Sequence, residues 1–158
     1  MSDIIIRRAE EKDIPTIDRL LFQVNKVHSD VRPDLFKSGA KKYTDTELAQ
    51  ILKNDKSPVF VACISGKVVG YAFCIFKQFI NDNNLTDIKT LYIDDLCVDE
   101  SIRGNHIGKA LYEYVLGYAN KNDFYNVTLN VWADNRGAVK FYEKIGLEIQ
   151  KIGMEKIL

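Results

Sequence analysis

Excess charge, paired cysteines and long apolar runs are all missing from this sequence, and each absence excludes a class of protein. Twenty-two basic residues balance twenty-two acidic ones, so no net field draws the chain to nucleic acid or to an anionic membrane. No apolar run approaches the roughly 20 residues that a membrane span needs. The stretch Met1–Glu10 lacks the basic-then-apolar pattern of a signal peptide. We therefore expect a cytoplasmic protein with neither nucleic-acid nor membrane partners.

The cysteines argue against a disulfide framework and against a zinc site. Cys63, Cys74 and Cys97 lie far apart inside apolar stretches, and the sequence has no Cys-x-x-Cys pair. We expect three buried, reduced thiols. No motif in the sequence requires a metal.

The sequence also has no internal repeat, no low-complexity tract and no linker rich in proline, glycine or serine. Its 158 residues, 46% of them hydrophobic, suffice for one continuous core. A single domain over residues 1–158 is predicted.

Hydrophobic periodicity predicts alternating strands and helices. The expected strands are Ile4–Ile6, a hairpin of 59–64 and 68–76 joined by Ser65-Gly66, then 91–98, 127–132, and one or two short strands in 149–158. The expected helices begin after an N-cap at Asp13, after Thr44 or Asp45, at Ile107 and at Arg136, the last ending before Gly146. Residues 25–42 are expected to form a connection or a bent helix pair. An antiparallel meander that feeds a β-α-β crossover gives a mixed α/β sheet with helices on both faces.

The segment from Asp94 to Lys109 carries the strongest chemical signal. A strand is followed by a short turn, Arg103-Gly104-Asn105-His106-Ile107-Gly108, that opens a helix. A helix N-terminus presents unpaired N–H groups and the positive end of the helix dipole, so the turn is a candidate pyrophosphate cradle. It is neither a P-loop, which ends in Gly-Lys-Ser/Thr, nor the three-glycine dinucleotide fingerprint.

This turn, preceded by Leu96-Cys97-Val98, resembles the Arg/Gln-x-x-Gly-x-Gly/Ala coenzyme A signature of the GNAT superfamily of N-acyltransferases. The segment Asn135–Leu147 resembles the family's late Asn-x-x-Ala/Ser-x-x-Phe-Tyr element. The likeness covers nearly the whole chain and implies a central mixed β-sheet of about six to seven strands flanked by about four helices. Two separate motifs in the right order are far more specific than either alone. The chain departs from the signature at His106, where the family has a glycine.

The resemblance implies an acetyl-CoA-dependent N-acetyltransferase, with acetyl-CoA as co-substrate and a small-molecule primary amine as acceptor. It assigns coenzyme A binding to the strand end, the turn, and the start and middle of the last helix: Leu96, Cys97, Val98, Arg103, Gly104, Asn105, His106, Ile107, Gly108, Lys109, Asn135, Ala138 and Tyr142. A left-handed backbone suits histidine less well than glycine, so His106 either adds a positive contact to the phosphates or points to solvent. Asn135 is expected to fix coenzyme A, to cap the last helix, or both.

An alkylamine with a pKa of about 10.4 arrives charged and must lose a proton before it attacks the thioester. The resemblance makes Asp94 the proton acceptor or cation anchor and Tyr142 the donor to the departing thiolate. Strand alternation predicts that Asp94 and Asp95 point to opposite faces. The alternative readings are a solvated carboxylate at either aspartate and a core tyrosine at Tyr142. Cys97 is not expected to act as a nucleophile, because no histidine lies near it in sequence.

The acceptor is less well defined than the reaction. The candidate substrate residues are His28, Arg32, Asp94 and Asp95. Asp34 and Tyr43 lie in the same variable region as His28 and Arg32. Trp132 is expected to belong to the core or to the wall of the pocket. The acceptor could also be a protein N-terminus or lysine, or the domain could be a catalytically silent coenzyme A sensor. Family members are often dimers, so a homodimer stays open.

Overall fold

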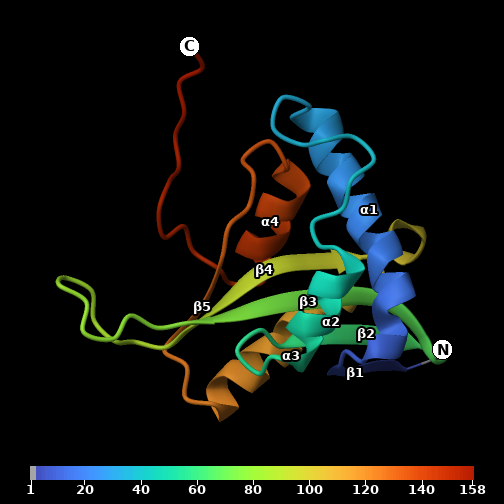
Figure 1. Ribbon diagram of the computed structural model, residues 1–158, viewed down its shortest axis with the longest axis horizontal. Helices are drawn as coiled ribbons and strands as arrows, with labels where there is room; N and C mark the ends of the chain where they lie inside the picture. Colours follow the sequence, from blue (N-terminus) through green and yellow to red (C-terminus); the bar gives the residue numbers. More distant parts are fainter. Residues whose placement is uncertain (1–2) are drawn as a thin grey trace.

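The computed structural model describes residues 3–158; Met1 and Ser2, which begin the stretch read for a signal pattern, lie outside the described residues. Within 3–158 the strands form one five-stranded sheet in the order β1-β2-β3-β4-β5, antiparallel except for the parallel pair β4 and β5 (Figure 1). The strands are β1 Ile4–Arg8, β2 Val59–Ile64, β3 Lys67–Lys77, β4 Thr90–Val98 and β5 Asn126–Leu129. The α-helices are α1 Ile14–Val31, α2 Asp45–Lys53, α3 Ile107–Lys121 and α4 Arg136–Lys144. The mixed α/β class is confirmed.

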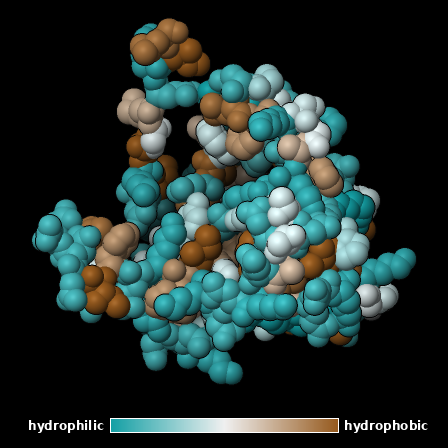
Figure 2. Space-filling model, viewed as in Figure 1, coloured by the Kyte–Doolittle hydropathy of each residue, from teal (hydrophilic) through white to brown (hydrophobic). Residues whose placement is uncertain are grey.

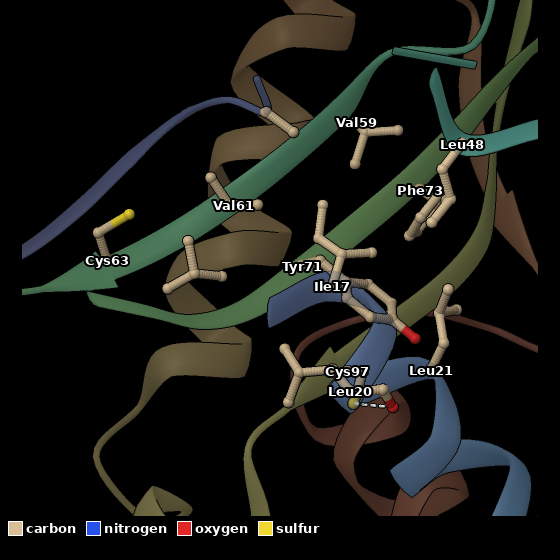
Figure 3. Packing of buried hydrophobic residues seen from close by; sticks show 12 residues of the cluster. Ile17, Leu20, Leu21, Leu48, Val59, Val61, Cys63, Tyr71, Phe73 and Cys97 are labelled. Atoms are coloured by element: carbon tan, nitrogen blue, oxygen red, sulfur yellow. Dashed lines mark hydrogen bonds between the residues drawn. The ribbon is translucent and has the colours of Figure 1, made fainter. Parts of the chain in front are cut away.

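Helices cover both faces of the sheet, and each face has its own apolar core. On one face α1 and α2 contribute Ile17, Leu20, Leu21 and Leu48, which pack on Val59, Val61, Tyr71 and Phe73 (Figure 3). On the other face α3 contributes Ile107, Leu111, Tyr112, Val115 and Ala119. Strand residues alternate between these cores, as expected of a sheet buried on both sides.

Several local signals predicted their elements correctly. Thr44 caps α2 by accepting the Glu47 N–H at 3.1 Å, while the Glu47 carboxylate accepts the Thr44 N–H at 3.0 Å. Ser65 and Gly66 both take positive φ in the β2–β3 hairpin, as a tight turn requires. Gly146 ends α4 with φ +106°. Local turn and cap chemistry therefore fixes these boundaries.

The first helix differs from the prediction at both ends. Asp13 makes no N-cap bond; its carboxylate instead accepts two hydrogen bonds from Arg7, at 2.7 and 2.9 Å, and one from the Glu10 N–H. The helix also continues through 25–31, where a connection or bent pair was expected. Val24, Val27 and Val31 keep the helical spacing there, and Lys26 pairs with Asp30 four residues on at 2.7 Å.

The C-terminal segment departs most from expectation. Residues 149–158 form no strand, β5 ends at Leu129 rather than near Trp132, and within 3–158 the sheet has five strands instead of six to seven. A strand needs a hydrogen-bonding neighbour, and in this chain the segment runs away from the sheet (Figure 1). No helix among the described residues is long and apolar enough to cross a membrane.

Candidate active site

The centre of β4 contains a bulge that places both aspartates on the same side of the sheet. Phe73 pairs with Asp95 and the next residue, Cys74, pairs with Ile93, so Asp94 is the extra residue on β4. The bulge reverses the alternation: Ile93 packs in the α3 core, whereas Asp95 reaches Tyr71 in the α1/α2 core. The prediction of opposite faces is wrong, because it assumed an unbroken strand.

Asp94 is held by two residues from the segment between α1 and α2. Tyr43 donates a hydrogen bond to the Asp94 carboxylate, and the Lys42 ammonium lies 3.0 Å from it. Burial and the bond to Asp94 both raise the pKa of the Tyr43 phenol, so it stays a donor. The charge of Asp94 is thus already balanced by Lys42 before any substrate enters.

Asp95 is held differently, by neutral donors: the Tyr71 hydroxyl and the Leu96 backbone N–H. The Tyr71 hydroxyl donates to its carboxylate at 2.7 Å. Burial raises the pKa of Asp95 to about 6, although the Tyr71 hydrogen bond and the charge of Lys42 act in the opposite direction. A carboxylate with this pKa is ionised at neutral pH and is a stronger base than an exposed aspartate.

Tyr142 lies on α4 within electrostatic range of Asp95 and Cys97. Burial raises the pKa of its phenol to about 12, and electrostatic interactions with Asp95 and Cys97 add to the shift. Burial likewise raises the pKa of the Cys97 thiol to about 12, and the thiol lies 3.9 Å from the Leu20 carbonyl oxygen (Figure 3). The Tyr142 phenol therefore carries its proton at neutral pH but is a weaker acid than an exposed tyrosine, and a protonated thiol is a poor nucleophile.

The backbone edge of β4 beside these side chains is open. β5 pairs with β4 only from Thr90 to Ile93, and among the described residues no strand pairs with the next segment of β4 on that side. Leu96, Cys97 and Val98 are bonded to β3 on their other side, opposite Ala72, Tyr71 and Gly70. An extended pantetheine arm could therefore add to β4 as a strand would.

The turn before α3 has the geometry of an anion cradle. Gly104 and His106 both have positive φ, +95° and +57°, and no side chain caps the start of α3. Arg103, Gly104, Asn105, His106 and Lys109 are exposed, whereas Ile107 is buried in the α3 core. His106 thus takes the left-handed conformation that the family glycine would take, with its ring at the surface. The N–H groups that open α3 remain available to phosphate oxygens.

Gly108 and Asn135 also have structural roles. A Cβ on Gly108 would lie 3.3 Å from the Phe141 ring, so the glycine lets α4 pack closely on the start of α3. The Asn135 side chain caps α4 by accepting the Ala138 N–H at 3.2 Å. The capping prediction for Asn135 is confirmed, and its contact with coenzyme A stays a prediction.

His28 lies on α1 and Arg32 directly follows its last residue, and both line a small cleft. The His28 ring stacks on Phe36 with centroids 4.9 Å apart, and Phe36 meets Trp132 edge-on at 5.6 Å. Burial, and then the charge of Lys42, lowers the pKa of His28. Lys42 is therefore within electrostatic range of both His28 and Asp94, while Arg32 is occupied by Asp34 and by Glu155 at 2.6 Å.

Sequence reasoning missed three residues that shape this site. Tyr71 and Lys42 bind the two aspartates, and Phe36 joins His28 to Trp132. Tyr71 could have been found, because a tyrosine at the centre of an apolar strand needs a partner for its hydroxyl. Lys42 and Phe36 lie in an irregular segment, where no periodicity indicates which side chains point inward.

Comparisons with known proteins agree with this geometry. The model of the acetyltransferase (GNAT) family matches residues 24–147, and the chain belongs to that family. An uncharacterised N-acetyltransferase of Methanocaldococcus jannaschii is 30% identical over 112 residues, which cover 71% of this chain and 48% of that protein. An L-amino acid N-acetyltransferase of Escherichia coli is 26% identical over 162 residues, covering 100% and 91%. The chain thus spans about half the length of the first relative and most of the second.

A solved structure shows the same fold. A tetramutant of the BH1408 protein from Bacillus halodurans superposes with a TM-score of 0.93 at 32% identity, covering 98% of this chain and 99% of that one. The family match and the two relatives together identify this chain as an N-acetyltransferase domain. The family uses acetyl-CoA as co-substrate.

Proposed function

We propose that this domain transfers the acetyl group of acetyl-CoA to the primary amine of a small molecule by direct attack. Asp95 accepts the amine proton, directly or through a water molecule. The amine nitrogen then attacks the thioester carbonyl carbon and the carbon–sulfur bond breaks. The Tyr142 phenol protonates the departing thiolate, which leaves as the thiol of coenzyme A. The excess proton that remains on the nitrogen restores the Tyr142 phenol, and Asp95 releases its proton to solvent, so the products are the N-acetylated amine, coenzyme A and one proton.

One observation carries this proposal: a carboxylate of raised pKa and a protonated phenol lie within electrostatic range beside the open edge of β4. Asp95 rather than Asp94 is the base in this scheme, since Lys42 already neutralises Asp94. The sequence also predicted Asp94 as a cation anchor; in this scheme it holds Lys42 instead, so its effect on the acceptor is indirect.

The residues that line the β4 edge and the α3 turn fit the co-substrate. The pantetheine arm would lie along Leu96, Cys97 and Val98, and the pyrophosphate would meet the turn 103–109 at the start of α3. One backbone N–H of this β4 segment would polarise the acetyl carbonyl.

The acceptor is proposed to enter beside the His28 cleft. Lys42 is a half-exposed cation within electrostatic range of His28 and 3.0 Å from Asp94, and it suits an amine whose molecule also carries a carboxylate. The Escherichia coli relative is named for L-amino acids, which have this pattern, so amino acids are the first acceptors to test.

The test is coenzyme A release from acetyl-CoA by the purified domain, with amino acids, polyamines, aminoglycosides and short peptides as acceptors. Turnover with a small amine is expected. Asp95→Asn should lower kcat by a factor of about 10² to 10⁴, the range for loss of a general base, with Asp94→Asn acting mainly on the KM of the amine. Asp55→Asn is the matched control, because the Asp55 carboxylate is fully exposed and lies far from Asp94 and Asp95 in the sequence. Turnover with peptides alone, or an Asp95→Asn variant at full rate, would overturn the proposal.

A further inference from the structure

A second cleft lies at the end of α3 that is remote from the proposed active site. Its volume is about 170 Å³, and its lining residues come from the loop before β2, the end of β3, the start of β4 and the end of α3. The loop before β2 lies beside this end of the helix (Figure 1). The turn that would meet the pyrophosphate is at the other end of the same 15-residue helix, about 22 Å away at 1.5 Å per residue. The two sites therefore share no residue.

Aromatic rings form the walls of this cleft. Phe76 meets Phe124 edge-on with ring centroids 5.5 Å apart, and Tyr118 lies beside Phe124 at 6.4 Å. None of the three rings is fully buried, and the buried side chains of Pro58 and Leu91 line the cleft between them. A cavity of about 150 Å³ is enough to hold one benzene ring. The cleft therefore has room for one six-membered ring with a small substituent.

A lysine supplies the cationic group of the cleft. The Lys89 ammonium lies 4.8 Å from the ring centroid of Phe124 and 5.8 Å from that of Phe76. It donates a hydrogen bond to the Asn122 carbonyl oxygen at 2.6 Å, and among residues 3–158 no carboxylate pairs with it. An ammonium that is partly shielded from water by apolar rings attracts an anion more strongly than a fully exposed one does. Lys89 thus favours an anion that carries an apolar body.

The groups around Lys89 point to the same kind of ligand. The Lys56 ammonium also lies 5.8 Å from the Phe76 centroid, and no carboxylate in the described part of the chain pairs with it. Asp55 lines the cleft too, but its carboxylate is 98% exposed and lies 3.6 Å from the Arg8 guanidinium. Apolar side chains alone would not indicate a ligand, because they gather in several separate groups on the mostly hydrophilic face that Figure 2 shows. The indication comes from rings and unpaired ammonium groups together.

We propose that this cleft binds a small aromatic carboxylate. The ring of the ligand lies against Phe76, Tyr118 and Phe124, and its carboxylate pairs with the Lys89 ammonium. Edge-to-face and offset contacts with several rings favour an aromatic ligand over an aliphatic one. The Lys89 ammonium repels a ring compound that carries an amine, so the cleft discriminates by charge as well as by shape.

The test is a titration of the intact, isotopically labelled chain with benzoate, followed by the chemical shifts of its amides. We expect a dissociation constant of about 1 mM or tighter. Benzamide has the same ring without the charge and should bind at least about tenfold more weakly, because it loses a charge-assisted hydrogen bond. Acetate, which has the charge without the ring, should bind more weakly still. No binding at about 10 mM benzoate, or equal binding of benzoate and benzamide, would refute the proposal.

A matched pair of lysine variants separates this cleft from general surface charge. Lys89→Gln should weaken benzoate binding at least about tenfold. Lys77→Gln is the control, since the Lys77 ammonium also lies over an aromatic ring, 4.0 Å from the Tyr92 centroid, but Lys77 does not line the cleft. Its dissociation constant should stay within about twofold of that of the unchanged chain. Equal effects of the two substitutions would rule out Lys89 as the partner of the carboxylate.

The position of the shifted amides distinguishes this cleft from the proposed active site. Benzoate should shift the amides of Leu91, Asn122 and Phe124 and leave those of the turn 103–108 in place. It should still bind when acetyl-CoA saturates the chain. Shifts confined to the turn and the β4 edge, or loss of benzoate binding in the presence of acetyl-CoA, would overturn the proposal. None of these readouts depends on catalysis, so the outcome is independent of the proposed acetyl transfer.

Discussion

The Tyr71 hydroxyl donates a hydrogen bond of 2.7 Å to the Asp95 carboxylate across the pair of strands β3 and β4. Tyr71 is fully buried and packs edge-on against Phe73, with ring centroids 4.9 Å apart. The hydroxyl has no freedom to turn away, so it fixes the orientation of the carboxylate. Together with the Lys42 pair at Asp94, this contact distinguishes the two neighbouring aspartates.

In the pH profile of acetyl transfer, the fall in rate at acidic pH (the acidic limb) should be set by protonation of Asp95. Because burial raises the pKa of Asp95 to about 6, kcat/KM is expected to fall about tenfold for each pH unit below that value. Above it, kcat/KM should level off, because the ammonium form from which Asp95 takes the proton persists up to a pKa of about 10.4. A pH profile measured with the best acceptor checks this, and a rate that stays flat from pH 5 to pH 9 would contradict it.

Removing the Tyr71 hydroxyl should move that limb. Its hydrogen bond favours the ionised carboxylate and lowers the pKa of Asp95, so Tyr71→Phe should raise the pKa and shift the limb to higher pH. Tyr43→Phe is the matched control, because Tyr43 bonds Asp94 instead. An equal shift in both variants would mean that the limb reports the pair of aspartates rather than Asp95.

Asp95→Asn should make the fold more stable while it removes activity. The pKa of about 6 in the folded state lies above the unfolded value of about 3.9, so Asp95 weakens the fold as pH rises between these values, and the loss is complete above 6. The asparagine has no charge to bury and can still accept from Tyr71. We expect about 1–3 kcal/mol of added stability at pH 7 and none at pH 3.5, measured by urea unfolding at both pH values. A gain of the same size at both pH values would point to a cause other than ionisation.

Gly70→Ala should destabilise the sheet where β3 supports the proposed pantetheine edge. A Cβ at position 70 would lie 2.8 Å from the Cys97 carbonyl oxygen and 3.2 Å from Leu111, and the carbonyl cannot move without shifting β4. Overpacking of this kind costs about 1–3 kcal/mol, so the melting temperature should fall and the KM for acetyl-CoA should rise. Gly117→Ala, in the middle of α3 with open space around it, should instead stabilise by about 0.5–1 kcal/mol. Equal effects at the two glycines would contradict the argument.

The elements that sequence predicted well are those with their own local chemistry. The Thr44 cap, the Ser65-Gly66 hairpin and the Gly146 helix end each depend on residues within a few positions of one another. The same holds for the turn at 103–108, where Gly104 and His106 take positive φ. These interactions survive in any tertiary context, and so they are visible in the chain alone.

The features that sequence missed depend on what packs against them. The bulge at Asp94 follows from the register between β3 and β4, and no residue in β4 signals it. The choice between Asp94 and Asp95 then depends on Lys42 and Tyr71, which are more than 20 positions away in the chain. The segment 149–158 has the residues of a strand, but a strand exists only beside another strand.

His106→Gly separates the backbone role of the turn from any role of the imidazole. His106 has φ +57° and ψ +22°, a left-handed conformation that costs a residue with a Cβ about 1–2 kcal/mol. Glycine avoids this cost but loses more conformational entropy on folding, so a net gain of about 0.5–1 kcal/mol is expected in thermal or urea unfolding. The KM for acetyl-CoA should stay within twofold, because the N–H groups at the start of α3 remain in place. Asp123→Gly, at φ +60° beyond the far end of α3, is the matched control and should give the same stability gain without touching the turn. A tenfold rise in KM in the His106 variant alone would assign the imidazole a direct contact with the phosphates.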